Sequence, residues 1–185
     1  MITHWDFSIL HWIADHLQTA FLDPVMIFFT FLGEVGIVWI LLGVLLLYRP
    51  RFRRAGAAIL IALLLSLLLC NILLKNAVHR PRPFQLEEVT LLISPPGEFS
   101  FPSGHASSSF AAATALFCLH KKEGAATLCL AALIAFSRLY LFVHFPSDVL
   151  CGSVVGIVCG LLSSCVFSRF LLRFRFFQNE IKETG

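Results

Sequence analysis

The feature that most limits how this chain can fold is an apolar run of membrane-spanning length over residues 55–74 (AGAAILIALLLSLLLCNILL), which holds no charged side chain. An α-helix needs about 20 consecutive apolar residues to cross the hydrocarbon core of a bilayer. Similar stretches flank this run, and of the 185 residues 58% are hydrophobic and only 14% charged, whereas soluble domains carry roughly 25% charge. The sequence therefore predicts an integral membrane protein of the all-α class.

Six transmembrane helices are predicted from these stretches. Residues 21–48 are almost wholly apolar, but Gly33, Glu34 and Gly36 interrupt them where a turn between two short spans is expected. One long tilted helix is the alternative, and it would place Glu34 inside the bilayer. The other four spans are predicted over 55–74, 106–119, 125–143 and 149–172.

Shorter segments flank the spans at both ends of the chain. Residues 1–19 alternate Trp, Ile, Leu and Phe with His and Asp at roughly helical spacing, which predicts an amphipathic helix lying at the membrane interface. The whole chain, residues 1–185, is interpreted as one membrane domain. It comprises that helix, a six-span core over 20–176 with polar loops over 75–105 and 137–148, and a tail over 177–185.

The arginines and lysines between the spans indicate the orientation of the chain. In the six-span arrangement, every basic residue outside the polar loops falls on one side of the membrane. These residues are Arg49, Arg51, Arg53, Arg54, Lys121, Lys122, Arg169, Arg173, Arg175 and Lys182. Because cytoplasmic loops are enriched in Lys and Arg, we expect a multi-pass protein of the cell (inner) membrane, with both termini cytoplasmic and the polar loops on the extracytoplasmic face.

Three separate blocks of polar residues lie at the ends of the predicted spans that face this side. Charged groups at such positions are expensive to keep near lipid and are therefore usually functional. The blocks are Lys75 with Arg82 and Pro83, then Pro102, Ser103, Gly104 and His105, then Ser137, Arg138, His144 and Asp148.

The cations and the second block suit a phosphate group. Arg82 and Arg138 offer planar forks that match two phosphate oxygens, and Lys75 adds a point charge. Ser103 and Gly104 begin a helix whose free N–H groups and dipole favour an anion. Taken singly, these residues also fit as helix-end anchors or ordinary helix-start residues. Their occurrence together on one face indicates a phosphate site.

The third block adds a candidate nucleophile. Asp148 is expected in the first turn of the last helix, within reach of His144. A carboxylate that accepts a hydrogen bond from one imidazole nitrogen fixes the tautomer and leaves the other nitrogen free to attack. An interfacial salt bridge is the simpler alternative for this pair. A metal site is not expected, because three cations on the same face would repel a dication.

The three blocks together resemble the complete three-part signature of the type 2 phosphatidic acid phosphatase superfamily: Lys75-x6-Arg82-Pro83, Pro102-Ser103-Gly104-His105 and Ser137-Arg138-x5-His144-x3-Asp148. Likeness to its membrane-bound branch, which includes bacterial undecaprenyl-diphosphatases, implies a metal-independent lipid phosphatase that needs no cofactor. The resemblance implies that His144 attacks phosphorus to form a phosphohistidine, Asp148 orients it and His105 protonates the leaving oxygen. It further implies phosphate binding by Lys75, Arg82, Ser103, Gly104 and Arg138.

The expected substrate is a lipid phosphate, with undecaprenyl diphosphate as first choice and phosphatidic acid or phosphatidylglycerol phosphate as alternatives. The loop acids Glu87, Glu88 and Glu98 either select a head group or are ordinary solvated residues. A transporter, with charges near the bilayer midplane, or a catalytically silent lipid-binding protein is the alternative from another class. The net charge of +3 comes without a basic arm, so nucleic acid is not an expected partner. No obligate protein partner is inferred.

Overall fold

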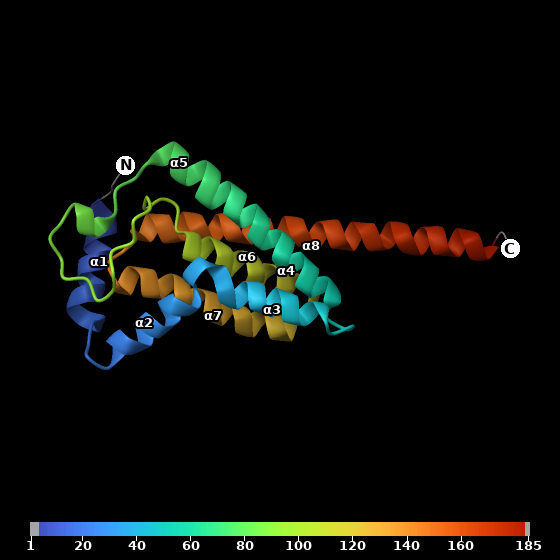
Figure 1. Ribbon diagram of the computed structural model, residues 1–185, viewed down its shortest axis with the longest axis horizontal. Helices are drawn as coiled ribbons and strands as arrows, with labels where there is room; N and C mark the ends of the chain where they lie inside the picture. Colours follow the sequence, from blue (N-terminus) through green and yellow to red (C-terminus); the bar gives the residue numbers. More distant parts are fainter. Residues whose placement is uncertain (1–3, 184–185) are drawn as a thin grey trace.

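The computed structural model describes residues 4–183, and within them the side chains of residues 4–166. The secondary structure of this part is wholly helical, which confirms the all-α class (Figure 1). The helices are α1 (His4–Leu17), α2 (Leu22–Leu32), α3 (Ile37–Leu47), α4 (Arg53–Ser66), α5 (Lys75–Val78), α6 (Gly104–Leu119), α7 (Lys121–Tyr140) and α8 (Pro146–Glu183). Two 3-10 turns, η1 (Glu34–Gly36) and η3 (Pro83–Gln85), and the π-helical stretch η2 (Leu67–Leu74) complete the elements. The helix α8 runs through most of the predicted tail, whose last two residues lie outside the described ones.

The helices form a bundle in which α6 contacts α4, α7 and α8 (Figure 1). Small residues allow this packing, because α6 is rich in Ala and Ser and the facing side of α8 repeats glycine at Gly152, Gly156 and Gly160. A Cβ at Gly156 would lie 2.3 Å from the carbonyl oxygen of Ser107, so glycine is required for this backbone approach. Small residues at this spacing are a common means of close packing between membrane helices. The contact fixes α6 against α8.

The same contact positions the N-terminus of α6. Gly152 lies against the backbone of Ser103, whose carbonyl oxygen would be 2.5 Å from an added Cβ. The amide of Ser103 donates a hydrogen bond to the carbonyl oxygen of Asp148, with a nitrogen–oxygen distance of 3.1 Å. The first turns of α6 and α8, which carry the second and third sequence blocks, are therefore joined through their backbones.

Helices α2 and α3 form a bent pair rather than a hairpin. The helices are bent by 44° at a short break, where Val35 has a φ of +51° and Gly36 a φ of +68°. The predicted break within residues 21–48 is present, but two spans would need a near reversal of the chain there, so the two-span interpretation is not confirmed. The chain bends there and continues toward the far end of the bundle (Figure 1). The alternative of one long helix is closer to the structure, although η1 breaks that helix.

Fewer helices than predicted have the length and hydropathy of a full membrane span. Among the described residues three do, Arg53–Gln85, Lys121–Tyr140 and Pro146–Val166, and the bent pair raises the number to four. Helix α6 is shorter, with 16 residues. The structure supports a protein with transmembrane helices, but it does not confirm six spans.

The two ends of the bundle carry different parts of the chain. The α3–α4 and α6–α7 connections meet at one end, where the ring centroids of Phe52 and His120 lie 4.4 Å apart. Helix α1, the segment from α5 to α6 and the α7–α8 connection lie at the other end (Figure 1). Because α2 and α3 together pass along the bundle once, α1 and the last turns of α8 lie at opposite ends. The predicted path, with both termini on one side, does not match this arrangement.

The predicted N-terminal helix is present as α1. It buries Leu10 and Ile13 among residues of the α7–α8 connection and the neighbouring loops, and it exposes Trp5 and Trp12. Its one buried acidic residue, Asp6, joins the polar contacts described below. The location of α1 at a membrane interface stays a prediction.

Candidate active site

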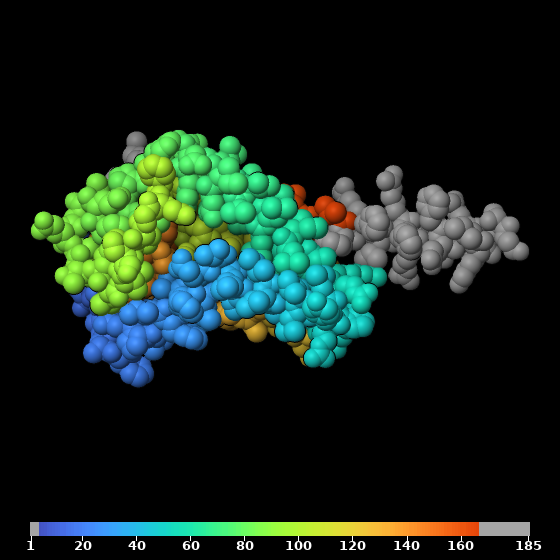
Figure 2. Space-filling model, viewed as in Figure 1, coloured from blue at the N-terminus to red at the C-terminus, as the bar shows by residue number. Residues whose placement is uncertain are grey.

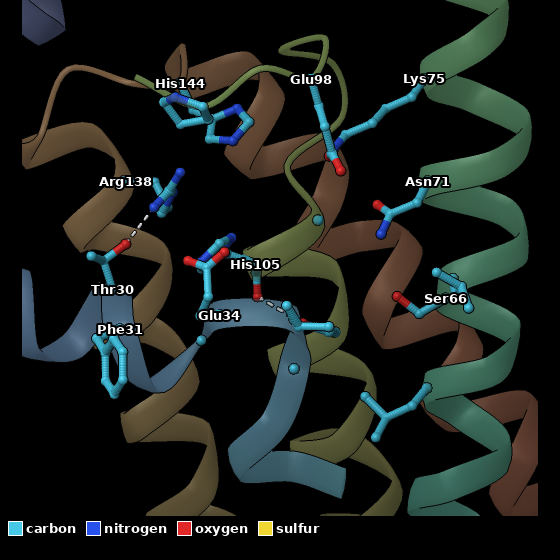
Figure 3. A pocket seen from close by; sticks show the side chains of 18 of the residues that line it. Thr30, Phe31, Glu34, Ser66, Asn71, Lys75, Glu98, His105, Arg138 and His144 are labelled. Atoms are coloured by element: carbon cyan, nitrogen blue, oxygen red, sulfur yellow. Dashed lines mark hydrogen bonds and ion pairs between the residues drawn. The ribbon is translucent and has the colours of Figure 1, made fainter. Parts of the chain in front are cut away.

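The three sequence blocks converge at one end of the bundle around a cavity of about 860 Å³ (Figure 3). Six of the eight predicted site residues line this cavity: Lys75, Arg82, Gly104, His105, Arg138 and His144. The other two are fully buried beside this lining. Ser103 directly precedes Gly104 in the chain, and Asp148 contacts His144. The structure therefore brings together all eight residues, which come from the three sequence blocks.

His144 is buried in the connection between α7 and α8 and has neighbours on both ring nitrogens. Its Nδ1 lies 3.6 Å from Oδ2 of Asp148 and 3.5 Å from Oγ of Ser100. Its Nε2 lies 3.2 Å from Nη1 of Arg82. A ring held in this way has Nδ1 directed toward the carboxylate and Nε2 toward the guanidinium that lines the cavity.

The carboxylate of Asp148 is surrounded by donors. Nη1 of Arg80 and Oγ of Ser100 each donate a hydrogen bond to it at 2.5 Å, and the amide of Phe145 donates at 2.9 Å. Arg80 also donates to Asp6 of α1 at 2.7 Å, so its guanidinium bridges two buried carboxylates. These contacts fix the orientation of the carboxylate that faces His144.

Arg82 is held in place by backbone acceptors. Its Nε donates to the carbonyl oxygen of Glu98 at 2.7 Å, and its Nη1 donates to that of Val143 at 2.8 Å. Both acceptors are neutral, so the positive charge of this buried guanidinium is not cancelled by them. Arg82 is thus a fixed cation beside His144.

The other two cations have side-chain partners at the cavity wall. Arg138 on α7 donates to the hydroxyl of Thr30 on α2, and its Nε is buried without a hydrogen-bond partner (Figure 3). Lys75 forms an ion pair with Glu98, whose carboxylate is mostly exposed. With Arg82, these residues place three positive charges around one space, which suits a phosphoryl group.

The N-terminus of α6 completes the anion-binding side of the cavity. Ser103 caps the helix, and its hydroxyl accepts a hydrogen bond from the amide of Ala106 at 3.5 Å. A Cβ at Gly104 would lie 2.8 Å from Oδ1 of Asn71 on η2, so a side chain there would have to displace the Asn71 amide. The first amides of α6 face the cavity with the positive end of the helix dipole, as in other phosphate sites.

Ionisation of the groups outside the helices fits anion chemistry. Burial lowers the pKa of His144 well below its ordinary value of 6.5, and the positive charges of Arg82 and Arg138 lower it further. The hydrogen bond from Lys75 lowers the pKa of Glu98 below its ordinary value of 4.5. At neutral pH, His144 is therefore an uncharged imidazole and Glu98 a carboxylate.

Four functional contacts are not evident from the sequence blocks. Arg80 and Ser100 both bind Asp148, Asp6 binds Arg80, and Glu34 lies beside His105. For Asp6 and Glu34, the only signal in the sequence is a carboxylate within an apolar segment, where charge is unusual. For Arg80 and Ser100, no spacing rule indicates the contact, because it depends on the path of the loop between α5 and α6.

Comparison with known proteins gives close relatives over most of the chain. Residues 55–171, more than half of the chain, match the model of the PAP2 superfamily. An undecaprenyl-diphosphatase of Sulfolobus acidocaldarius is 33% identical over 153 residues, covering 82% of this chain and 73% of that protein. The undecaprenyl-diphosphatase BcrC of Bacillus subtilis is 31% identical over 160 residues, covering 84% and 79%. The crystal structure of LpxE from Aquifex aeolicus matches with a TM-score of 0.77 at 32% identity, covering 87% of this chain and 95% of that one.

The match to the family includes all three polar blocks. It begins in the first turn of α4 and ends within α8, so Lys75 and Asp148 both lie inside it. It leaves out everything before α4, including α1, which supplies Asp6 to the site, and η1, which supplies Glu34. The family to which the sequence pattern points is confirmed: this chain belongs to the PAP2 superfamily.

Proposed function

We propose that this protein hydrolyses a phosphate group from a lipid, with undecaprenyl diphosphate as the first-choice substrate, through a phosphohistidine intermediate. The two relatives described above are named as phosphatases, and the reaction class follows from the family. The observation that carries the proposal is that two histidines and three cations line the same cavity, while the rest of its wall is largely apolar. That combination suits a charged head group attached to an apolar tail.

We propose a role in phosphoryl transfer for each of these residues. Nε2 of His144 attacks phosphorus, and the bond between phosphorus and the leaving oxygen breaks while His105 gives that oxygen a proton. Asp148 holds the Nδ1 side of the nucleophile. The phosphoryl oxygens, whose charge is stabilised in the transition state, are bound by the cations and the first amides of α6. The residues in that group are Lys75, Arg82, Arg138, Ser103 and Gly104.

The second step removes the phosphate from the enzyme. Water attacks phosphorus, gives a proton to His105 and displaces Nε2 of His144, which recovers its lone pair. Orthophosphate leaves, and both histidines return to their starting states. The same cations serve both steps, because the same oxygens carry the charge.

The apolar part of the cavity wall fits a lipid tail. Phe31 and Ile40 on the bent pair face it from one side, and Leu63 and Leu67 face it from α4 and η2. Figure 2 shows a hollow on this face between the α2–α3 segment (blue) and the segment from α4 to the loop before α6 (green to yellow-green). A tail leaving through this hollow would stay in the bilayer while its phosphate meets the cations. The names of the two relatives favour a polyprenyl diphosphate.

We place the site on the extracytoplasmic face of the cell membrane. Six basic residues lie in or next to the connections at the opposite end of the bundle, which the positive-inside rule assigns to the cytoplasm. They are Arg49, Arg51, Arg53, Arg54, Lys121 and Lys122. Since the bent pair passes along the bundle once, this orientation puts α1 on the same side as the site, and the end of α8 in the cytoplasm.

The proposal is tested by orthophosphate release from the purified protein in detergent with EDTA. The substrates are undecaprenyl diphosphate, phosphatidylglycerol phosphate and phosphatidic acid. We expect release without added metal, fastest from undecaprenyl diphosphate, and a loss of at least about 10⁴-fold in His144→Ala. If the wild-type protein released no phosphate from any lipid, the proposal would be wrong, and a transporter or a silent lipid-binding protein would be favoured. Release only after metal was restored would also contradict the proposal.

Trapping of the intermediate tests the role of each histidine. We expect labelled phosphate to remain on His105→Ala after an alkaline quench, because the attack by His144 is retained while water activation is slowed. His144→Ala should carry no label. Equal labelling of the two variants would contradict the assignment of His144 as the nucleophile.

A further inference from the structure

One carboxylate reaches the cavity from outside both the three sequence blocks and the region matched by the family. Glu34 begins η1, at the break between α2 and α3, and lines the cavity. Its Oε2 lies 3.6 Å from Nε2 of His105 (Figure 3). Among the described residues, it is the carboxylate within ion-pair distance of that ring.

His105 presents a nitrogen that needs a partner. Its Nε2 is shielded from solvent and has no hydrogen-bond partner. A buried ring nitrogen without a partner is costly. The side chain of Glu34 is 60% exposed, so it has room for the small movement that would complete a hydrogen bond.

The backbone around Glu34 is shaped to bring carboxylate and ring together. Val35 has a φ of +51°, which is unfavourable for a β-branched residue, and its side chain is 85% exposed, so packing does not explain the conformation. A Cβ at Gly33 would lie 2.7 Å from Cδ2 of His105, so glycine lets the bend approach the ring. Strained backbone of this kind is often found at functional sites.

The other charged groups around His105 do not take the place of Glu34. Burial of the ring disfavours a positive charge on it, and so does Arg138, which faces the ring from α7, while His144 and Glu98 act from farther across the cavity. A protonated imidazole among these cations requires a nearby negative charge. Glu34 supplies that charge from the closest range.

We infer, building on the phosphatase function proposed above, that Glu34 is a positioning residue for His105. It accepts the Nε2–H, fixes the ring and stabilises the imidazolium that serves as the acid. When Nε2 of His144 bonds to phosphorus and the bond to the leaving oxygen breaks, the remaining N–H of His105 passes its proton to that oxygen and the ring becomes neutral. When water attacks the phosphohistidine, its proton returns to the same ring. Glu34 stays ionised throughout.

The test compares two aryl phosphates that differ in their need for an acid. Nitrophenolate leaves phosphorus readily without a proton, whereas phenolate is helped by one. In Glu34→Gln we expect kcat/KM, which reports transfer to His144, to fall about 10- to 100-fold for phenyl phosphate and by less than about threefold for 4-nitrophenyl phosphate. The alkaline limb of the kcat/KM profile for phenyl phosphate should move to lower pH, because the imidazolium has lost its neighbouring charge.

Two variants serve as controls. Glu34→Asp keeps the carboxylate and should recover part of the discrimination between the two substrates. Glu98→Gln removes the other carboxylate that lines the cavity, and it should change both kcat/KM values by the same factor. Gel filtration and melting temperature in detergent check that each variant is folded.

Three outcomes would overturn the inference. Equal losses on both aryl phosphates with an unchanged alkaline limb would make Glu34 a structural residue only. A lower KM with unchanged kcat would make it an anion that the substrate displaces. A wild-type protein that hydrolyses neither the lipids nor the aryl phosphates would overturn the phosphatase function itself, and with it this role. If the wild type is active and Glu34→Gln gives either of the first two results, only the role of Glu34 is overturned.

Discussion

The two histidines of the cavity are held in different ways. His144 is enclosed by Ser100, Asp148 and Arg82, all buried and all linked to further groups by hydrogen bonds. For His105, Nε2 lies 3.6 Å from Oε2 of Glu34, and Glu34 is at the bend between α2 and α3. The proposed nucleophile is thus oriented before any substrate binds, whereas the proposed acid has its carboxylate partner at the edge of the bundle.

The contrast follows from where each partner originates in the chain. The surroundings of His144 are built where α6 and α8 pack through glycine contacts, in the centre of the bundle. Glu34, the partner of His105, comes from the bend between α2 and α3. Asp6, which is linked to His144 through Arg80 and Asp148, comes from α1. Both acids precede residue 55, where the match to the family begins. The part of the chain that matches the family therefore holds the proposed nucleophile, while the N-terminal part of this chain adds one carboxylate to each side.

The largest effect is expected next to the enclosed histidine, His144, in Asp148→Asn. The amide keeps the shape of the carboxylate but cannot hold the Nδ1–H of His144 as an anion does, and it leaves Arg80 without one of its two buried charges. We expect kcat/KM for the lipid substrate to fall about 10³- to 10⁴-fold, as when a comparable histidine loses its carboxylate. A fall of less than about tenfold would mean that Ser100 and Arg82 suffice to hold His144.

The pH profile measures how strongly the cavity disfavours a charge on His144. Because burial, Arg82 and Arg138 hold its pKa well below 6.5, His144 stays neutral, and kcat/KM should not lose an essential base as the pH falls through 6.5. Arg82→Gln removes a positive charge that disfavours the imidazolium, so the pKa of His144 rises and the acidic limb moves to higher pH. Arg82→Lys keeps the charge and should keep the limb.

Both Arg82 variants should lose activity, by about 10²-fold, because a phosphoryl oxygen loses a fixed donor. The comparison between them separates charge from geometry. An acidic limb near pH 6.5 in the wild type, or the same limb in both variants, would contradict the assignment of that limb to His144.

The sequence is sufficient to predict the centre of the site but not its surroundings. Lys75, Arg138 and His144 stand out because charged or titratable groups are rare in an apolar chain, and their spacing places them at helix ends. The contacts of Ser100 with Asp148 depend on a loop whose path no periodicity describes. Hydropathy gives the apolar length of residues 21–48 but not the direction of the chain. The left-handed conformation of Val35 has no signal in a β-branched residue, so Glu34 is expected in a turn instead of the cavity.

A smaller effect is expected on the link between α1 and the enclosed histidine. Asp6→Asn removes one of the two carboxylates that Arg80 bridges, and the loss of one partner of a buried ion pair costs about 3 kcal/mol. We expect a lower melting temperature in detergent and about a tenfold fall in kcat/KM, since Arg80 then shifts against Asp148. The exposed Asp15 on the same helix gives the control, Asp15→Asn, which should change neither quantity.

If Asp6→Asn lowered the melting temperature but left kcat/KM unchanged at a temperature where the protein is folded, α1 would stabilise the bundle without orienting Asp148. If neither quantity changed, the bridge through Arg80 would carry no energy. Either result would confine the positioning of His144 to the region matched by the family.

The smallest effect is expected in Glu98→Gln, which removes the ion pair between Glu98 and Lys75. In the wild type, Glu98 pairs with Lys75, and that hydrogen bond lowers the pKa of Glu98 below 4.5. The pair is therefore intact above that pH and is lost only as the pH falls through the lowered pKa. A substrate phosphate has to compete with Glu98 for Lys75, so the glutamine variant should lower KM by about two- to threefold and leave kcat unchanged, because exposed ion pairs contribute only about 0.2–1 kcal/mol. Glu88→Gln, an exposed change in the same loop, should alter neither constant. A higher KM in Glu98→Gln would instead show that this carboxylate holds Lys75 in position for the phosphate. Lys75 would then be oriented before substrate binds, as His144 is.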